Sequence, residues 1–258
     1  MRKIIKIGIG IAVVMVVVAG TLSYYNNKQY EESFTSEYNY RITLGTDSTL
    51  KNLTLYIPLP IFRDGSKIGD EIIAGNASKP SNWNLSIVNT EHGKMLKIIA
   101  NEFIPEYHSL PVAIHPGEET AELPEQKTSD TYSQDTPVLS SSKEITVTLR
   151  ADHKINTTNP AENEPLLSPK YNLTLSSYNM PYPEGRTPPV VYKYESRINA
   201  DYAASPGANL SVIISLKGMN SWWVYDWSFK EYSDRIDATI TGEQHGWSNA
   251  AGNLEFGR

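Results

Sequence analysis

Apolar and polar residues alternate with a period of two over most of the chain after Ser36, as in half-buried β-strands. The stretch 36–44 has this pattern, and after a turn at 45–49 the stretch 52–59 repeats it. Similar stretches follow at 83–89, 94–101, 145–149, 173–175 and 190–200. About nine or ten strands without helical periodicity predict an all-β ectodomain, and an antiparallel β-sandwich would cover their apolar faces.

The C-terminal region predicts an antiparallel meander. Its strands are expected at 210–216, 223–229 and 236–240, with the first turn at 218–220. The middle strand would place Trp223, Tyr225, Trp227 and Phe229 on one face, and we interpret that face as core. An aromatic platform for sugar rings is the alternative. Trp222, on the opposite face, and Trp247 are the candidates for exposed contacts with a partner.

Only the N-terminus departs from this pattern with a long apolar segment. Residues 4–22 contain a single charge, Lys6, and as a helix they would measure about 28 Å, close to the ~30 Å hydrocarbon core of a bilayer. Basic residues precede the segment, and Tyr24 and Tyr25 follow it where an aromatic belt belongs. This predicts a signal anchor contacting the membrane through residues 4–25. The N-terminus would be cytoplasmic, with residues 1–29 as stub and anchor and 30–258 as extracellular domain.

Two features leave this organisation open in part. A cleavable signal peptide, cut after Val17-Val18-Ala19, is the alternative to a retained anchor. The stretch 105–142 is rich in Pro, Ser, Thr and Glu and predicts a long loop or a linker between subdomains, and 156–169 and 181–189 predict shorter connections.

Composition narrows the chemistry. The chain has no cysteine, which excludes disulfides and thiolate metal sites, and its net charge of −6 argues against nucleic acid as a partner. The five histidines form no metal-binding motif, and no catalytic or cofactor motif is present. An acid/base or metal site around His108 and His115, in the acidic loop, is the weaker alternative to a solvated loop. We therefore assign no catalytic residue, metal or cofactor.

Six Asn-x-Ser/Thr triplets are candidate glycosylation sites. They begin at Asn52, Asn76, Asn84, Asn156, Asn172 and Asn209. Four of them place a leucine between the asparagine and the hydroxyl residue, and strand geometry then predicts that Leu53, Leu85, Leu173 and Leu210 point inward.

The basic anchor, the segment LKNLTLYIPLPI at 50–61, the many triplets and the absence of cysteine together resemble the uncharacterised surface proteins of methanogenic archaea. The resemblance implies an archaeal envelope location and no functional residue. The function expected is a non-enzymatic binding or structural module of the cell envelope. The alternatives are an extracellular hydrolase or carbohydrate-binding protein, and an accessory subunit of a surface complex that makes contacts through Trp222 and Trp247.

Overall fold

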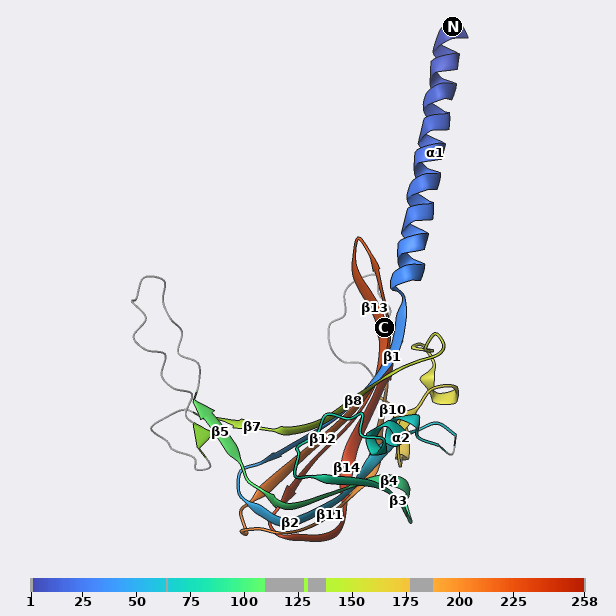
Figure 1. Ribbon diagram of the computed structural model, residues 1–258. Helices are drawn as coiled ribbons and strands as arrows, with labels where there is room; N and C mark the ends of the chain where they lie inside the picture. The colour runs from blue at the N-terminus through green and yellow to red at the C-terminus, as the bar shows by residue number, and fades with distance from the viewer. Residues whose placement is uncertain (1, 64, 110–127, 130–137, 177–187, 258) are drawn as a thin grey trace, which may run out of the picture.

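The computed structural model describes residues 2–63, 65–109, 128–129, 138–176 and 188–257. A long helix, α1 (Arg2–Ser33), runs away from a β-structured body and continues into the first strand, β1 (Thr35–Thr46) (Figure 1). Within the part of the chain that is described, no helix is both long enough and apolar enough to span a membrane.

The body consists mainly of one 11-stranded sheet in the order β3-β4-β2-β11-β14-β13-β12-β1-β8, with β10 paired to β11 and β9 paired to β2. Neighbouring strands are antiparallel. After β1, the strands are β2 (Leu50–Ile61), β3 (Asn84–Thr90), β4 (Gly93–Phe103), β8 (Lys143–Arg150), β9 (Leu166–Ser168), β10 (Tyr171–Ser176), β11 (Val190–Ala203), β12 (Asn209–Val224), β13 (Asp226–Thr241) and β14 (Gln244–Phe256).

The mostly β class is confirmed, but the predicted β-sandwich gives way to a single curled sheet (Figure 1). Alternate apolar residues of the long strands line its inner face, for example Tyr40 in β1, Leu55 in β2 and Ile214 in β12. Strands of 12–16 residues accumulate enough twist to curl the sheet around its own core. The inner face therefore packs against itself, and no second large sheet covers it among the described residues.

A short helix, α2 (Lys67–Ile73), lies across the open side of the curled sheet, where it contacts β2 and β3 near one edge and β8 at the other. Its Ile68 and Ile72 are buried in the core. Just after α2, Ser78 forms an antiparallel bridge with Thr146 of β8. The helix and this bridge link the two sheet edges, which the alternation pattern alone did not predict.

The predicted turn at 218–220 is wrong, because β12 continues to Val224 and the chain reverses at Tyr225. Gly218 lies inside the strand, where its missing side chain makes room for the ring of Tyr232 on β13. Gly218, which suggested a turn in the sequence, therefore allows β12 and the Tyr232 side chain to pack closely. Trp223 consequently belongs to β12, while Trp227 and Phe229 belong to β13.

Parts of the predicted loops are ordered structure. The stretch 105–142 begins with β5 (Glu106–Ser109) and ends with β7 (Val138–Ser141), which pair in a three-stranded sheet with β6 (Thr128–Ser129). The segments 110–127 and 130–137 lie outside the described residues, as do 181–187 of the third connection. The stretch 156–169 contains the short helix η1 (Pro160–Glu162) and β9.

Candidate functional site

A cleft of roughly 480 Å³ opens where the start of α2 meets the end of β8. Apolar side chains form much of its wall, and charged groups from three segments stand around them. The lining residues are Tyr38, Pro60, Phe62, Gly65, Ser66, Lys67, Ile68, Asp70, Leu149, Arg150, Ala151, Asp152, His153, Asn163 and Pro165. Apolar walls with a few placed polar groups are typical of small-molecule sites.

The α2 side of the cleft is fixed by the way the helix begins. Ser66 is its N-cap, and the Ser66 hydroxyl accepts a hydrogen bond from the Gly69 amide at 2.9 Å. Ile68 and Ile72 then anchor the helix in the core, which leaves the exposed Lys67 and Asp70 at the cleft. A capped, buried turn of helix gives this wall a defined position.

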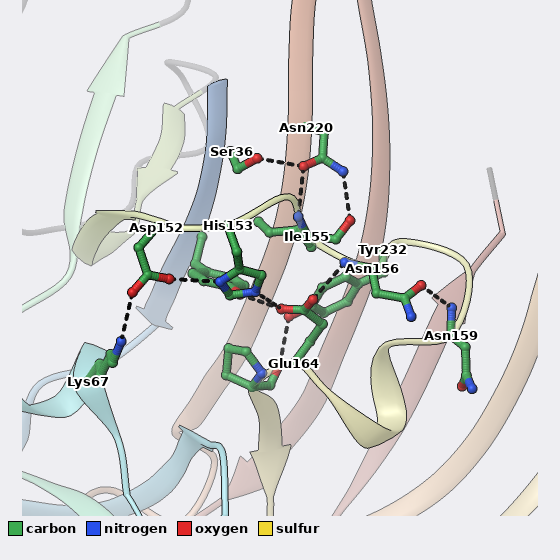
Figure 2. A network of polar contacts seen from close by, with 12 residues as sticks. Ser36, Lys67, Asp152, His153, Ile155, Asn156, Asn159, Glu164, Asn220 and Tyr232 are labelled. Carbon is green, nitrogen blue, oxygen red and sulfur yellow. Dashed lines mark hydrogen bonds and ion pairs between the residues drawn. The ribbon is translucent and has the colours of Figure 1, made fainter. Parts of the chain in front are cut away.

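His153 stands between two carboxylates on the opposite wall (Figure 2). Its Nδ1 lies 2.8 Å from Asp152 Oδ1, and its Nε2 lies 3.4 Å from Glu164 Oε2. The hydrogen bond with Asp152, helped by the charge of Glu164, raises the pKa of His153 above its ordinary 6.5. The same hydrogen bond with His153, and then the charge of Lys67 at 3.7 Å, lower the pKa of Asp152.

Glu164 is the buried member of this group, with a side chain only 1% exposed. Its carboxylate accepts the Tyr38 hydroxyl proton in a short hydrogen bond and the amide of Asn156 at 2.6 Å. Burial first, and then this bond to Glu164, raise the pKa of Tyr38. The carboxylate is therefore satisfied by two donors and the His153 ring, as a buried charge requires.

The loop that carries His153 is tied to the sheet by a buried amide. Asn220 of β12 accepts from the Ile155 amide at 3.0 Å and donates to the Ile155 carbonyl at 2.8 Å, while Ser36 donates to the same Asn220 oxygen at 2.7 Å (Figure 2). The Asn220 side chain thus bonds both the N–H and the C=O of Ile155, as a paired residue of a neighbouring strand would. It holds the loop rigidly, so the His153 wall is preorganised.

The arrangement suits binding better than bond breaking. Both ring nitrogens of His153 face carboxylates, so neither is free to activate a hydroxyl group. Ser66, which also lines the cleft, uses its oxygen to cap α2. Among the described residues, no group of three or more His, Cys, Asp or Glu side chains could hold a metal ion. The cleft thus offers shape, apolar surface and fixed charge.

A second buried ion pair lies away from the residues that line this cleft. Asp234 of β13 is fully buried and accepts from Lys170 Nζ at 2.5 Å, the Tyr194 hydroxyl at 2.6 Å and the Leu167 amide at 2.7 Å. Burial lowers the pKa of Lys170, against the attraction of Asp234. With three donors on one carboxylate, this group fastens the β9 segment to the sheet.

The expected core assignment of the C-terminal aromatics is wrong. The side chains of Tyr225, Trp227 and Phe229 are exposed by 62–66%, and that of Trp223 by 37%. Conversely Trp222, expected to be an exposed contact, is half-buried against Tyr30 and Phe34 of the α1 end, at ring distances of 5.7 and 6.4 Å. The reason is the pairing register, which places Trp223, Trp227 and Phe229 on the outer face of the hairpin, opposite the buried even-numbered positions. In the described part of the chain, no strand pairs with the tip to cover that face.

Trp247, the other expected contact, is half-buried as well. Its ring meets His92 edge-on at 4.5 Å and lies 6.3 Å from Tyr56, and His92 Nδ1 is 3.0 Å from the Tyr171 hydroxyl. These residues form an aromatic cluster on the outer face of β2, β10 and β14. Trp247 is thus already in contact with the protein's own side chains.

The remaining histidines form no site with His153 among the residues that the structure describes. His245 is exposed between Asp201 and Glu243, at 2.7 and 3.1 Å, and these hydrogen bonds raise its pKa. His115 lies outside the described residues, and the side chain of His108 in β5 is not described either. An acid/base or metal site at His108 and His115 therefore stays a prediction.

The six candidate glycosylation sites differ in accessibility. Asn52, Asn76, Asn84 and Asn172 are exposed, whereas Asn156 and Asn209 are half-buried. The Asn209 side-chain amide donates to Asp47 at 2.7 Å, and its oxygen accepts from Thr241 at 2.8 Å. Both ends of that side chain are thus engaged, and glycosylation remains a prediction that favours the four exposed sites.

The leucines of these triplets follow the prediction at Leu53 and Leu210 and in part at Leu85, but not at Leu173. Leu53 and Leu210 are buried and Leu85 is half-buried, but Leu173 is 50% exposed, contrary to expectation. The register of β10 shifts between Tyr171 and Thr174, and Asn172 has a positive φ of 53°. An extra residue in an outer strand reverses the faces of its neighbours.

Comparisons with protein-family models, with curated proteins and with solved structures found no match. Sequence reasoning missed the candidate site, because Tyr38, Lys67, His153 and Glu164 are scattered along the chain and form no motif. Asp152 and His153, which are neighbours in the sequence, were the only feature of the sequence that could have indicated the site.

Proposed function

We propose that this chain is a membrane-anchored module of the cell envelope that binds a ligand in the cleft beside α2 and does not catalyse a reaction. Residues 1–29 are the cytoplasmic stub and anchor, and 30–258 form the extracellular part. The observation that carries the proposal is an apolar cleft whose one histidine has both ring nitrogens held by carboxylates. The archaeal location implied by the resemblance belongs to the same proposal.

The exposed surface of α1 supports the anchor. The side chains of Val14, Met15, Val16, Val17 and Val18 point to all sides of the helix and are 50–72% exposed. A helix that is apolar all round needs an apolar surrounding. In the sequence these residues continue a segment that begins at Ile4, ten positions before Val14. A bilayer would supply that surrounding over residues 4–22.

The fixed walls of the cleft support ligand binding. Phe62 and Leu149 offer half-buried apolar surface. Of the charged groups there, Lys67 pairs with Asp152, Asp70 is acidic, and Arg150 brings an exposed positive charge. We therefore expect the ligand to combine an apolar body with an anionic group that Arg150 contacts. The hydrolase alternative would need a nucleophile or a free base in the cleft, and the His153 geometry does not favour it.

The anchor is tested with the full-length protein in right-side-out membrane vesicles. We expect the protein to stay in the membrane after alkaline carbonate extraction. External protease should digest the chain beyond about Lys28 and leave the N-terminal segment protected. Release of intact protein by carbonate would contradict the anchor, and complete protection from protease would contradict the orientation.

The cleft is tested with 1-anilinonaphthalene-8-sulfonate, a probe with an apolar body and one sulfonate. Phe62→Ser should weaken saturable binding by at least about tenfold, since burying an aromatic ring contributes roughly 1.5–3 kcal/mol. Ile73→Ser is the matched control, because Ile73 is an exposed apolar residue of α2 that does not line this cleft. A Trp223→Ser/Trp227→Ser double variant accounts for probe bound at the hairpin. Equal affinity in Phe62→Ser and wild type would refute the cleft as the binding site.

A further inference from the structure

The tip of the β12–β13 hairpin is an exposed aromatic ribbon, consisting of residues 222–229. In its ladder Trp223 lies directly opposite Trp227, and Phe229 lies opposite Ser221, so the three rings share one face. Tyr225 occupies the turn. A patch of large aromatic side chains in solvent marks a contact surface. The ribbon thus requires an explanation that core packing does not provide.

The ribbon is held in a fixed direction by the end of α1. Beyond the last pair of β1 and β12, Thr35 with Ser221, the Ser33 hydroxyl bonds the backbone of Trp223, at 2.9 Å from its amide and 3.1 Å from its carbonyl oxygen. On the inner face of the ribbon, Trp222 packs on Tyr30 and Phe34. The ribbon therefore rises beside the base of α1, as Figure 1 shows. Because Trp222 faces the end of the helix, the opposite face, with the other aromatic rings, is turned away from it.

This position brings the ribbon close to the level of the aromatic pair Tyr24 and Tyr25. Tyr25 lies eight residues before Ser33, about 12 Å along the helix axis. The turn at Tyr225 lies two residues past Trp223, about 7 Å along the strand. About 5 Å then separates the ribbon backbone from the level of Tyr25, a distance that an aromatic side chain can reach.

Two lysines lie at the base of the ribbon, while its turn carries one carboxylate, Asp226, which accepts a hydrogen bond from the Trp227 amide at 2.7 Å. A hollow of roughly 470 Å³ between the α1 end, the ribbon base and the loop after β8 is lined by Tyr30, Trp222, Lys154 and Lys230, together with uncharged residues. Lys154 Nζ also lies 5.9 Å from the Phe34 ring centroid. In the part of the chain that the structure describes, neither lysine forms an ion pair. Aromatic rings next to such lysines match the apolar and anionic layers of a lipid headgroup region.

We propose that the aromatic ribbon inserts into the headgroup layer of the membrane that holds α1, and so provides a second membrane contact. The inference rests on the proposed anchor, because the bilayer level is set by residues 4–22. Two contacts on one bilayer would hold the curled sheet at a fixed tilt instead of letting it swing on α1. A sugar platform is the competing role for the same rings.

Spin labels can measure this contact, because the chain has no cysteine and each introduced one is unique. Tyr225→Cys reports the ribbon, Tyr24→Cys reports the anchor, and Ser205→Cys reports the exposed turn at the opposite end of β12. The labelled full-length proteins are reconstituted in vesicles of phosphatidylcholine and phosphatidylglycerol. Collision with oxygen, which is enriched in the bilayer, is compared with collision with a water-soluble nickel chelate.

We expect the labels at 24 and 225 to collide with the nickel chelate several-fold less than the label at 205. A label at 225 that behaves like the one at 205, while the label at 24 is in the bilayer, overturns the ribbon contact and leaves the anchor intact. A label at 24 that behaves like the one at 205 refutes the anchor, and the label at 225 then decides the ribbon separately. The sugar-platform role predicts that the label at 225 is fully accessible to the nickel chelate and that its spectrum changes when malto-oligosaccharide is added. That result would overturn the proposal.

Unlabelled protein gives an independent measurement. Lipids brominated in the upper acyl chain should quench part of the wild-type tryptophan emission, and Trp223→Phe/Trp227→Phe should remove most of that quenching. Trp247→Phe is the matched control, because Trp247 lies in the cluster on the outer face of the sheet. Equal quenching in the double variant and the control variant would contradict membrane contact by the ribbon.

Discussion

The two halves of the β12–β13 hairpin carry their large apolar residues on opposite faces. In the lower half Leu210, Val212 and Ile214 lie on the inner face and are fully buried. In the upper half Trp227 and Phe229 lie on the outer face, the face that carries Ser233 and Arg235 further along β13, and are 62–66% exposed. The lower half is flanked by β1 and β14, whereas the ribbon residues past Ser221 pair only with each other within the described sheet.

This difference shows what alternation does and does not report. A period of two identifies which residues share a face of a strand. Which of the two faces is core depends on the pairing register, and that register depends on where the chain turns. Because the turn is at Tyr225, Trp223 pairs with Trp227 on the outer face, and the aliphatic residues at even-numbered positions fill the core.

The largest effect is expected in the buried half of the hairpin, at Asp234. Asp234→Asn removes the partner of the buried Lys170 ammonium, so the variant should lose about 3–5 kcal/mol of unfolding free energy. Urea unfolding measures the loss. The control is Asp237→Asn, since Asp237 on the same strand pairs with Arg235 at the surface and should contribute less than about 1 kcal/mol. Similar losses in the two variants would contradict a buried role for Asp234.

The sequence predicted the faces of most strands correctly and their assembly only in part. Tyr40, Ile42 and Leu55 are buried as their alternation indicates. The curled single sheet was not predictable in this way, because its closure depends on strand twist and on α2 meeting both edges. The turn was misplaced because a glycine in the sequence is compatible with a turn and also with a strand position that a neighbouring ring contacts closely. Gly218 is of the second kind, since the Tyr232 ring packs against it.

The candidate site was less predictable than the fold. Glu164 lies in the stretch 156–169, which the sequence predicted as a connecting loop, yet its carboxylate is buried and bonds the Tyr38 hydroxyl. Tyr38 itself was assigned to the core face, which is correct but hides its hydroxyl group. A site assembled from such separate segments leaves no spacing pattern in the sequence.

A moderate effect is expected at the junction of the ribbon and α1. Trp222→Ala removes the ring packed between Tyr30 and Phe34 and should cost about 1–2 kcal/mol, since aromatic pairs add about 0.5–1.5 kcal/mol to area burial. Limited proteolysis after Lys28 should also become faster, because the end of α1 loses its contact with the sheet. Unchanged stability and unchanged cleavage would place Trp222 in solvent, as the sequence pattern suggested.

A smaller effect is expected for the pH dependence of the unfolding free energy, through His153 in the cleft. The pKa of His153 is raised in the folded protein, so its protonated form stabilises the fold fully below pH 6.5, and this contribution is lost as pH rises through the raised pKa. The unfolding free energy should therefore fall on going above pH 6.5, and His153→Gln should flatten the profile. His245 acts in the same direction, so the comparison is made in a His245→Gln background. A profile unchanged by His153→Gln would contradict the contact with Asp152 and Glu164.

The most direct test compares Ile214→Ala with Trp227→Ala, one from each half of the same hairpin, by urea unfolding of the full-length protein in detergent. Ile214 is fully buried, and its truncation should cost about 2–5 kcal/mol. Trp227 is 66% exposed, and its truncation should change stability by no more than about 0.5 kcal/mol, although it removes the larger side chain. A loss of about 3–5 kcal/mol in Trp227→Ala would show that the ribbon is core and would contradict its assignment as an exposed contact surface.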